Sequence, residues 1–311
     1  MGKIALFGAS GSLGRSIVHA LSAAGKSYRV VGRSEAPLRN AFGSDPLAEI
    51  VTWNPDDPAS VRQAAKDVDT LIYMVGVPYW QFELHPQLMR KTLDGAISAG
   101  VRQLLLIGTV YPFGKPRSER IGEDHPREPH TFKGQMRKQQ EDLVLEAHAS
   151  GKIAASVLRL PDFYGPQVDK SFLWSAFQAA KNGGRAQLVG PIDTPHEFVY
   201  VPDVGPVVQR LLEEPRTWGT TWNFGGAGVT STRAMVDEIF NQAGRKARYF
   251  IVGKTTLRLI GLFQPFMREL VEMHYLQTDP VILDDSRLRT LLGDLRKTPY
   301  PEGIRQTLAA M

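Results

Sequence analysis

The chain has 311 residues, with 37 Lys and Arg, 32 Asp and Glu, a formal net charge of +5 and no cysteine. Because cysteine is absent, disulfides, thiolate metal ligands and a cysteine nucleophile are excluded, and a reducing, cytoplasmic location is expected. Hydrophobic residues make up 42% and charged residues 22%, which excludes a disordered chain. No apolar run approaches the roughly 20 residues that cross a bilayer, and the basic residues are dispersed, so neither a membrane nor a nucleic acid is expected as a partner.

A glycine-rich turn at residues 8–14 follows the apolar run Ile4–Phe7 and precedes a helix that begins near Ser12. Glycine is needed in such a turn because the strand turns tightly, the backbone approaches phosphates closely and the helix packs against the strand. The free N–H groups at the helix start then face the phosphates. Strand, glycine turn and helix in this order predict a site for a dinucleotide pyrophosphate. The residues assigned to it are Gly8, Ser10, Gly11, Ser12, Leu13 and Gly14.

The next strand-like run, Tyr28–Ser34, ends where a βαβ unit recognises the ribose of the cofactor. An acidic side chain at this position would bind the 2′-hydroxyl of NAD. The chain instead has Arg33 and Ser34, which suit a 2′-phosphate. We therefore expect NADP(H) as the cofactor.

Further along, strand-like and helix-like runs alternate, which is typical of a doubly wound parallel sheet. The strands are expected at Glu49–Thr52, Thr70–Val75, Gln103–Gly108 and Ala155–Leu160, and the helices at Ser60–Lys66, Leu84–Ala99 and Phe132–Ala149. The predicted fold class is α/β, a Rossmann-type doubly wound parallel sheet with a smaller C-terminal substrate lobe. Residues 1–160, completed by about 197–224, form the NADP-binding domain, and 161–196 with 225–311 form the lobe. Within the lobe, Phe263–Met267 is expected to pack as core or as a lid.

Three more segments join the glycine turn in a shared pattern, namely Asn54–Asp57 after a strand, the turn Tyr164-Gly165-Pro166, and Asp203-Val204 after Phe198–Val201. From residue 1 to about residue 245 the chain resembles the extended short-chain dehydrogenase/reductases, which include NAD-dependent epimerases and dehydratases. The resemblance implies that Asn54 contacts adenine and that Val75, Gly76 and Val77 lie along the ribose. It also implies that the segment Leu158–Pro166, with Pro161, borders the nicotinamide.

The helix that carries the catalytic pair in that family departs from its pattern. The family has a tyrosine, three intervening residues and a lysine, and the lysine lowers the pKa of the tyrosine and binds the ribose. Here Lys133 stands in place of the tyrosine and Arg137 in place of the lysine. The usual proton donor is missing, and the chain is identified as an atypical member. Arg137 remains able to hold the ribose hydroxyls as a permanent cation.

Two groups are candidates for the missing donor. Thr109 and Tyr111 lie in a loop that resembles the family's Ser/Thr-x-x-Tyr-Gly loop, so Thr109 is expected to bond a substrate carbonyl and Tyr111 to donate a proton. Alternatively, Lys133 donates after its pKa is depressed by Arg137, which lies one helical turn away. A purely packing Tyr111 and a solvated, structural Lys133 also stay open.

Other polar residues are secondary candidates. Asp162, Tyr164 and His196 are expected to line the pocket. The seven histidines have no metal-ligand spacing, so no metal is expected.

Three functions remain open at this level. The first is an NADP(H)-dependent oxidoreductase acting on a small carbonyl or related substrate. The second is a sugar-nucleotide epimerase or dehydratase, which requires a strong acid/base and is disfavoured by the missing tyrosine. The third is a catalytically silent NADP(H)-binding sensor protein. A small-molecule substrate and a homodimer are expected.

Overall fold

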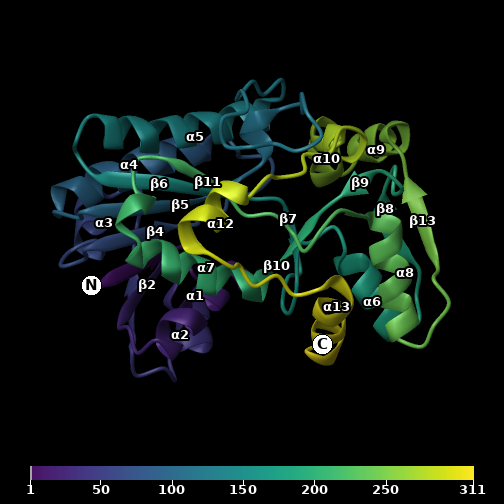
Figure 1. The fold of residues 1–311 in the computed structure, drawn as a ribbon, viewed down its shortest axis with the longest axis horizontal. Coiled ribbons are helices and arrows are strands. Elements are labelled where there is room, and N and C mark those ends of the chain that lie inside the picture. The colour runs from purple at the N-terminus through teal and green to yellow at the C-terminus, as the bar shows by residue number, and fades with distance from the viewer. Residues whose placement is uncertain (1) are drawn as a thin grey trace.

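The computed structural model describes residues 2–311, so residue 1 of the predicted first domain lies outside the described residues. The centre of the molecule is a seven-stranded sheet in the order β11-β6-β5-β4-β1-β2-β3, in which every neighbouring pair is parallel (Figure 1). The strands are β1 (Ile4–Phe7), β2 (Tyr28–Gly32), β3 (Ala48–Thr52), β4 (Thr70–Tyr73), β5 (Gln103–Thr109), β6 (Ala154–Leu160) and β11 (Thr221–Asn223). The order reverses between β1 and β4, which makes this pair the switch point of the sheet.

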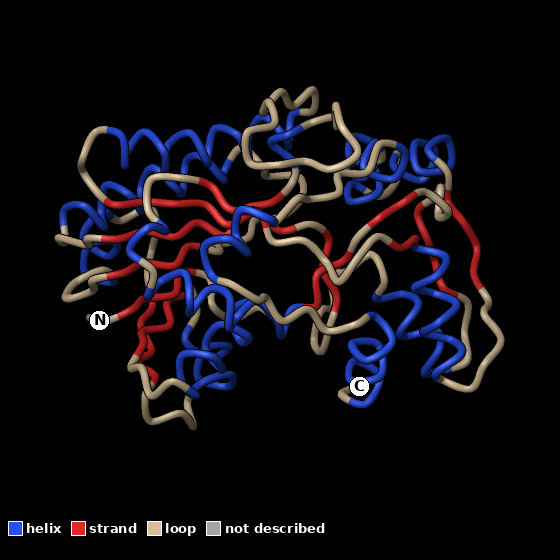
Figure 2. Tube along the Cα trace, viewed as in Figure 1, coloured by secondary structure: helices blue, strands red, loops and turns tan. Residues whose placement is uncertain are grey.

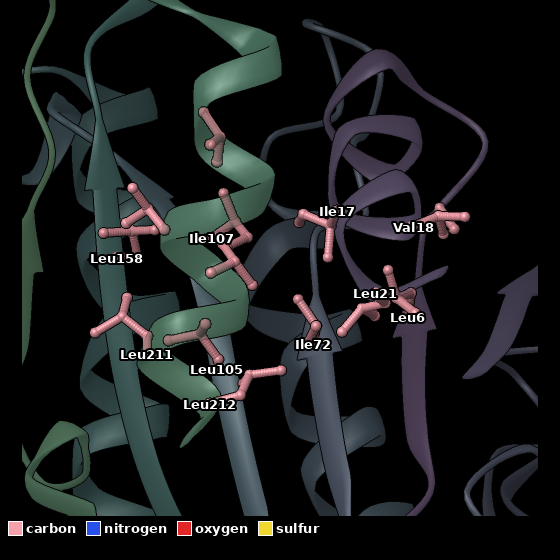
Figure 3. Packing of buried hydrophobic residues seen from close by; sticks show 14 of the residues in the cluster. Leu6, Ile17, Val18, Leu21, Ile72, Leu105, Ile107, Leu158, Leu211 and Leu212 are labelled. Carbon is pink, nitrogen blue, oxygen red and sulfur yellow. The ribbon is translucent and has the colours of Figure 1, made fainter. Parts of the chain in front are cut away.

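Helices cover both faces of this sheet because its inner strands are apolar on both sides. Residues alternate between the faces along each strand, so Leu6 packs toward α1 and α7 while Phe7 belongs to the core beneath α3, α4 and α5. Figure 3 shows Ile17 of α1 and Leu211 of α7 among the strand side chains of the first face. The helices are α1 (Ser12–Ala23), α2 (Glu35–Phe42), α3 (Pro58–Ala64), α4 (Leu84–Ser98), α5 (Phe132–Ala149) and α7 (Val201–Glu213).

The predicted α/β class is confirmed, and the observed element ends differ from the predicted ones by a few residues. The helix expected at Ser60 begins at Pro58, because Asp57 accepts the Ala59 N–H at 2.9 Å and proline suits the first helical position. The strand expected to reach Val75 ends at Tyr73.

Most of the remaining elements form the second part of the molecule, beside the carboxyl ends of the strands (Figures 1 and 2), but α12 (Ser286–Leu292) packs on β11, and the 3₁₀ turns at Tyr111–Phe113 and Pro215–Thr217 lie against α5 and α7. Phe177, Phe240 and Ile304, from three different helices, pack in its core. The strands are β7 (Asp162–Tyr164), β8 (Ala186–Val189), β9 (Pro195–His196), β10 (Phe198–Tyr200), β12 (Thr230–Ser231) and β13 (Tyr249–Val252). The helices are α6 (Trp174–Asn182), α8 (Thr232–Gln242), α9 (Lys254–Gly261), α10 (Pro265–Met273), α11 (Tyr275–Thr278), α12 (Ser286–Leu292) and α13 (Tyr300–Ala309), with short 3₁₀ turns η1 (Tyr111–Phe113) and η2 (Pro215–Thr217).

Individual segments cross the predicted division into two domains. Leu288 of α12 is fully buried in the core of the large sheet, although residues 225–311 are assigned to the lobe by sequence. The predicted division into a cofactor-binding domain and a substrate-binding lobe therefore does not describe where each helix packs. It remains a prediction about function. Within residues 2–311, no helix has the length and apolar character needed to cross a bilayer.

Candidate functional site

The predicted site residues lie beyond the carboxyl ends of neighbouring parallel strands. The glycine turn follows β1, Arg33 follows β2, Asn54 follows β3, Gly76 follows β4 and Tyr111 follows β5. In an open α/β sheet, ligands bind outside the carboxyl ends of the strands at the switch point. The topology therefore collects residues from five separate segments at one edge.

The three glycines of the turn are required for different reasons. Gly8 has φ +88°, and a Cβ there would lie 2.8 Å from the Val75 Cα. A Cβ on Gly14 would lie 2.0 Å from the Ala9 carbonyl oxygen, so that glycine permits helix and turn to touch. A Cβ on Gly11 would meet no described atom within 4 Å. The internal packing explains Gly8 and Gly14, whereas Gly11 faces open space.

The backbone N–H groups at the start of α1 are not capped by a side chain of the helix. Gly11 is the N-cap residue and supplies no capping hydrogen bond, and the first turn holds no acidic residue. The N-terminal N–H groups of a helix carry partial positive charge and bind anions well when no side chain satisfies them. Ser10 is exposed, and Ser12 and Leu13 are half-buried beside this opening. The geometry fits the pyrophosphate of a dinucleotide.

The residues expected to bind the rest of the cofactor differ in whether their side chains already have partners within the protein. Arg33 and Ser34 are exposed beyond β2, and the side chain of neither has a hydrogen-bond or ion-pair partner in the part of the chain that the structure describes. Gly76 faces open space in the same way as Gly11. The side chain of Asn54 instead accepts the Asp56 N–H at 3.0 Å. Its role toward adenine therefore stays a prediction, as do the roles of Val75, Val77 and the buried Pro161.

Lys133 is only 1% exposed, although it lies in the first turn of α5. Its ammonium group forms ion pairs with Glu269 and, at 2.8 Å, with Glu272, both on α10. Its backbone N–H also donates to Glu272 at 2.8 Å. Two carboxylates thus balance one buried cation, and the solvated Lys133 considered from the sequence is wrong.

Arg137 is also buried and directed into the protein. Its guanidinium donates to His85 Nδ1 at 3.1 Å and to the Ile107 carbonyl oxygen at 3.3 Å. Burial lowers the pKa of Arg137. Burial and the charge of Arg137 together lower the pKa of His85 to about 2, so His85 is neutral and offers a lone pair to the guanidinium. These partners compete with the predicted bond to a ribose.

A pair of tyrosines lies close to Lys133. The hydroxyl oxygens of Tyr111 and Tyr79 are 2.7 Å apart, and the Lys133 ammonium is 5.7 Å from the Tyr79 ring centre. The Thr109 hydroxyl accepts the Tyr111 N–H at 3.3 Å, which orients the loop. Sequence reasoning missed Tyr79. Its only signal was its place two residues after Val77, which the resemblance puts along the ribose.

Both hydroxyls stay protonated around neutral pH. Burial raises the pKa of Tyr79 to about 12. Burial, the neighbouring Tyr79 and the negative charge of Asp162 raise the pKa of Tyr111 well above its usual value. A neutral phenol of this kind is suited to give a proton to a strongly basic oxygen and poorly suited to accept one.

Further polar groups surround this pair. Asp162 accepts a hydrogen bond from His196 Nε2 at 2.9 Å, and the lining of a substrate pocket by both residues stays a prediction. The buried hydroxyl of Tyr275 has no partner within residues 2–311. Tyr164, also expected in the pocket, is fully buried against Tyr200 in the core of the second part, because its ring extends into that core rather than toward the sheet edge. That expectation is wrong.

The sheet order and the glycine turn define the class of the molecule as a Rossmann-type α/β protein. Residues 4–225 match the model of the NAD dependent epimerase/dehydratase family, and the chain belongs to this family. The predicted resemblance is thereby confirmed at the level of the family.

Individual relatives are distant but extend over most of the chain. The dTDP-6-deoxy-L-talose 4-dehydrogenase (NAD(P)(+)) of Kitasatospora kifunensis is 24% identical over 255 residues, which are 78% of this chain and 79% of that protein. The UDP-glucuronic acid 4-epimerase of Bacillus cereus, solved with NAD, superposes with a TM-score of 0.80 at 16% identity and covers 99% of this chain and 98% of its own. DesIV of Streptomyces venezuelae, a dTDP-glucose 4,6-dehydratase solved with NAD, gives 0.82 at 17% identity over 99% and 96%. These two solved structures share the fold.

Proposed function

We propose that the chain is a nicotinamide-dinucleotide-dependent oxidoreductase that reduces a carbonyl group, with Tyr111 as the proton donor. The observation that carries this proposal is the hydroxyl pair of Tyr79 and Tyr111, 2.7 Å apart, beside the position from which the family's tyrosine is missing. The two phenols stand at the same edge of the sheet as the open glycine turn.

The cofactor proposal has two levels. A nicotinamide dinucleotide is supported by the family, by relatives solved with NAD and by the freely accessible Gly11 and α1 start. NADP(H) in preference to NAD(H) is supported by Arg33 and Ser34, which are exposed directly after β2, where an NAD-binding chain would have an acidic residue. The K. kifunensis relative is named for both forms of the cofactor.

The proposed reaction adds a hydride and a proton across the C=O bond. A nicotinamide dinucleotide held by the glycine turn and Arg33 would supply the hydride that adds to the carbonyl carbon. The C=O π electrons move to oxygen, which takes the proton of the Tyr111 hydroxyl and becomes the alcohol. Tyr79 then donates a hydrogen bond to the Tyr111 phenolate until solvent returns the proton. Thr109 is proposed to orient the carbonyl, and Lys133 to hold α10 rather than to transfer protons.

The substrate class has two candidates. The family and the named relatives support a sugar nucleotide more directly than a small carbonyl compound. An epimerase or dehydratase begins by oxidising its substrate and needs a base, which the raised pKa values of Tyr79 and Tyr111 oppose. Reduction of a keto-sugar nucleotide satisfies both observations and is the second candidate beside a small aldehyde or ketone. The homodimer and the cytoplasmic location stay predictions.

The experiment begins with fluorescence titrations of NADPH and NADH. A screen of aldehydes, ketones, enones and keto-sugar nucleotides then follows the loss of reduced-nicotinamide absorbance. With a substrate in hand, Tyr111→Phe should lower turnover about a hundred- to ten-thousandfold while NADPH affinity stays nearly unchanged.

Tyr164→Phe is the matched control, because it also removes one buried hydroxyl but from the core of the second part. Unchanged turnover in Tyr111→Phe would exclude Tyr111 as the donor. Tight NADPH binding without turnover of any compound would favour the sensor function instead.

A further inference from the structure

Exposed large apolar side chains gather on one segment of the molecule. Nine such side chains are exposed among the described residues, and six of them fall between residues 250 and 266. Leu262 and Phe263, between α9 and α10, are 75% and 86% exposed. We call the six the hairpin patch: Phe250, Ile251, Leu259, Leu262, Phe263 and Phe266. Phe263–Met267 was expected to pack as core or as a lid, and the exposure of Phe263 makes the core alternative wrong.

The hairpin patch continues toward the rim of the candidate site. The ring of Phe266 lies 5.6 Å from the ring of Tyr79. Trp80, which follows Tyr79 in the sequence, is exposed. Phe132 is exposed as well and precedes Lys133, which is bound to Glu269 and Glu272 of α10. The hairpin patch itself comes from β13, α9, α10 and the connection between the two helices, which lie together at one end of the molecule (Figure 1).

The charge of the same segment has a single sign. Residues 246–268 contain five cations, Lys246, Arg248, Lys254, Arg258 and Arg268, and no acidic residue. All five are exposed. The first acidic residues of α10, Glu269 and Glu272, are directed inward onto Lys133, and Glu269 also approaches Arg268 at 3.5 Å. The segment therefore presents apolar side chains between positive charges.

We propose that the hairpin patch docks on the surface of an anionic lipid bilayer. Short amphipathic helices with Leu and Phe on one side and Lys and Arg around them lie in the plane of a bilayer surface, with the apolar side chains among the acyl chains and the cations at the headgroups. The charge complementarity selects this occupant over a second copy of the chain. A symmetric dimer formed through the same patch would bring five cations of each copy together.

This mode of contact differs from a membrane span. The predicted absence of a membrane partner rested on the lack of a long apolar run, and that lack bears only on spanning segments. A surface contact requires a few exposed apolar side chains with neighbouring cations, and these become visible only when the exposure of each side chain is known.

The test is co-sedimentation of the whole protein with vesicles of phosphatidylcholine, alone or mixed with phosphatidylglycerol. Binding is expected on the mixed vesicles and should weaken as salt is added. The double variant L262D/F263D should bind at least tenfold more weakly. Each of Lys254→Gln and Arg258→Gln should lower binding about fivefold.

The controls lie outside the hairpin patch. Val229→Asp changes the ninth exposed apolar residue, and Arg62→Gln with Lys66→Gln removes two exposed cations, one from α3 and one just after it, at the far end of the molecule. All variants should keep the circular dichroism and NADPH affinity of the unmodified protein, since the altered side chains are exposed. Absence of binding to the mixed vesicles, or equal binding by L262D/F263D, would overturn the proposal. The proposal would also be overturned if the unmodified protein formed a dimer without binding vesicles and L262D/F263D were a monomer. The hairpin patch would then bind a second copy of the chain.

Discussion

The predicted site residues of the glycine turn and those of α5 have opposite surroundings. Among residues 2–311, no atom of a non-neighbouring residue lies within 4 Å of a Cβ built at Gly11 or Gly76, and the Arg33 side chain has no hydrogen-bond or ion-pair partner. Lys133 and Arg137, at the positions where the predicted resemblance would place the catalytic pair, are buried and bonded to other parts of the chain. The open space at Gly11 and Gly76 is what the proposed binding of a dinucleotide requires. The two cations of α5 are instead satisfied by contacts within the protein.

The largest expected effect comes from Gly11→Val. A branched side chain at this position enters the space that the proposed pyrophosphate requires, so dinucleotide affinity should fall at least about a hundredfold while the fold survives. Fluorescence titration with NADPH measures the first effect, and thermal unfolding measures the second.

Gly253→Val is the matched control for this variant. Gly253 is the N-cap of α9, with φ −82° and ψ 171° against −80° and 176° at Gly11, and its Cβ would also meet open space. Normal NADPH binding by Gly11→Val would show that the turn is not the cradle.

Lys133→Met should lower stability. It leaves Glu269 and Glu272 without their cation, at a cost of about 2–3 kcal/mol, below the value for fully buried pairs because both carboxylates are partly exposed. Urea denaturation measures this loss.

The triple variant K133M/E269Q/E272Q tests the cause of that loss, because it removes the charges together. Most of the stability should return. A triple variant as unstable as Lys133→Met would show that packing, not charge, sets the cost.

Arg33→Ala should weaken NADPH binding about ten- to a hundredfold, since a charge-assisted contact to the 2′-phosphate is worth about 1.5–3 kcal/mol. NADH binding should barely change. Arg62→Ala on α3 is the comparison for removal of an exposed arginine. Equal affinities of the unmodified protein for NADPH and NADH would contradict the proposed preference.

The smallest expected effect is that of pH on the reductive turnover. The pKa of Tyr79 is raised to about 12 and that of Tyr111 is raised well above its usual value, so the donating form is complete at neutral pH and is lost only at strongly alkaline pH. His85, with a pKa lowered to about 2, stays neutral throughout. Turnover should therefore change by less than about twofold between about pH 6 and pH 9. A steep fall within this interval would point to another donor.

Features that depend on residues close together in the sequence could be predicted from it. The apolar runs and the glycine turn specify β1, α1 and the parallel sheet, because each follows from local backbone and burial preferences. The bonds from Lys133 to Glu269 and Glu272 connect positions 136 and 139 residues apart and have no local signature. The contact between Tyr79 and Tyr111 likewise depends on how two loops approach each other.

The two ion pairs of Lys133 also affect any attempt to restore the family's catalytic pair. Lys133→Tyr with Arg137→Lys would recreate the tyrosine-lysine motif but leave two glutamates beside a phenol that cannot neutralise them. Their charges would raise the pKa of that phenol, in opposition to the new lysine. Restoration therefore requires Glu269 and Glu272 to change as well, and the four positions are epistatic. Each single substitution at Lys133 leaves the shared buried cation missing and is expected to destabilise the protein, so a tyrosine-lysine pair is accessible here only through coupled changes.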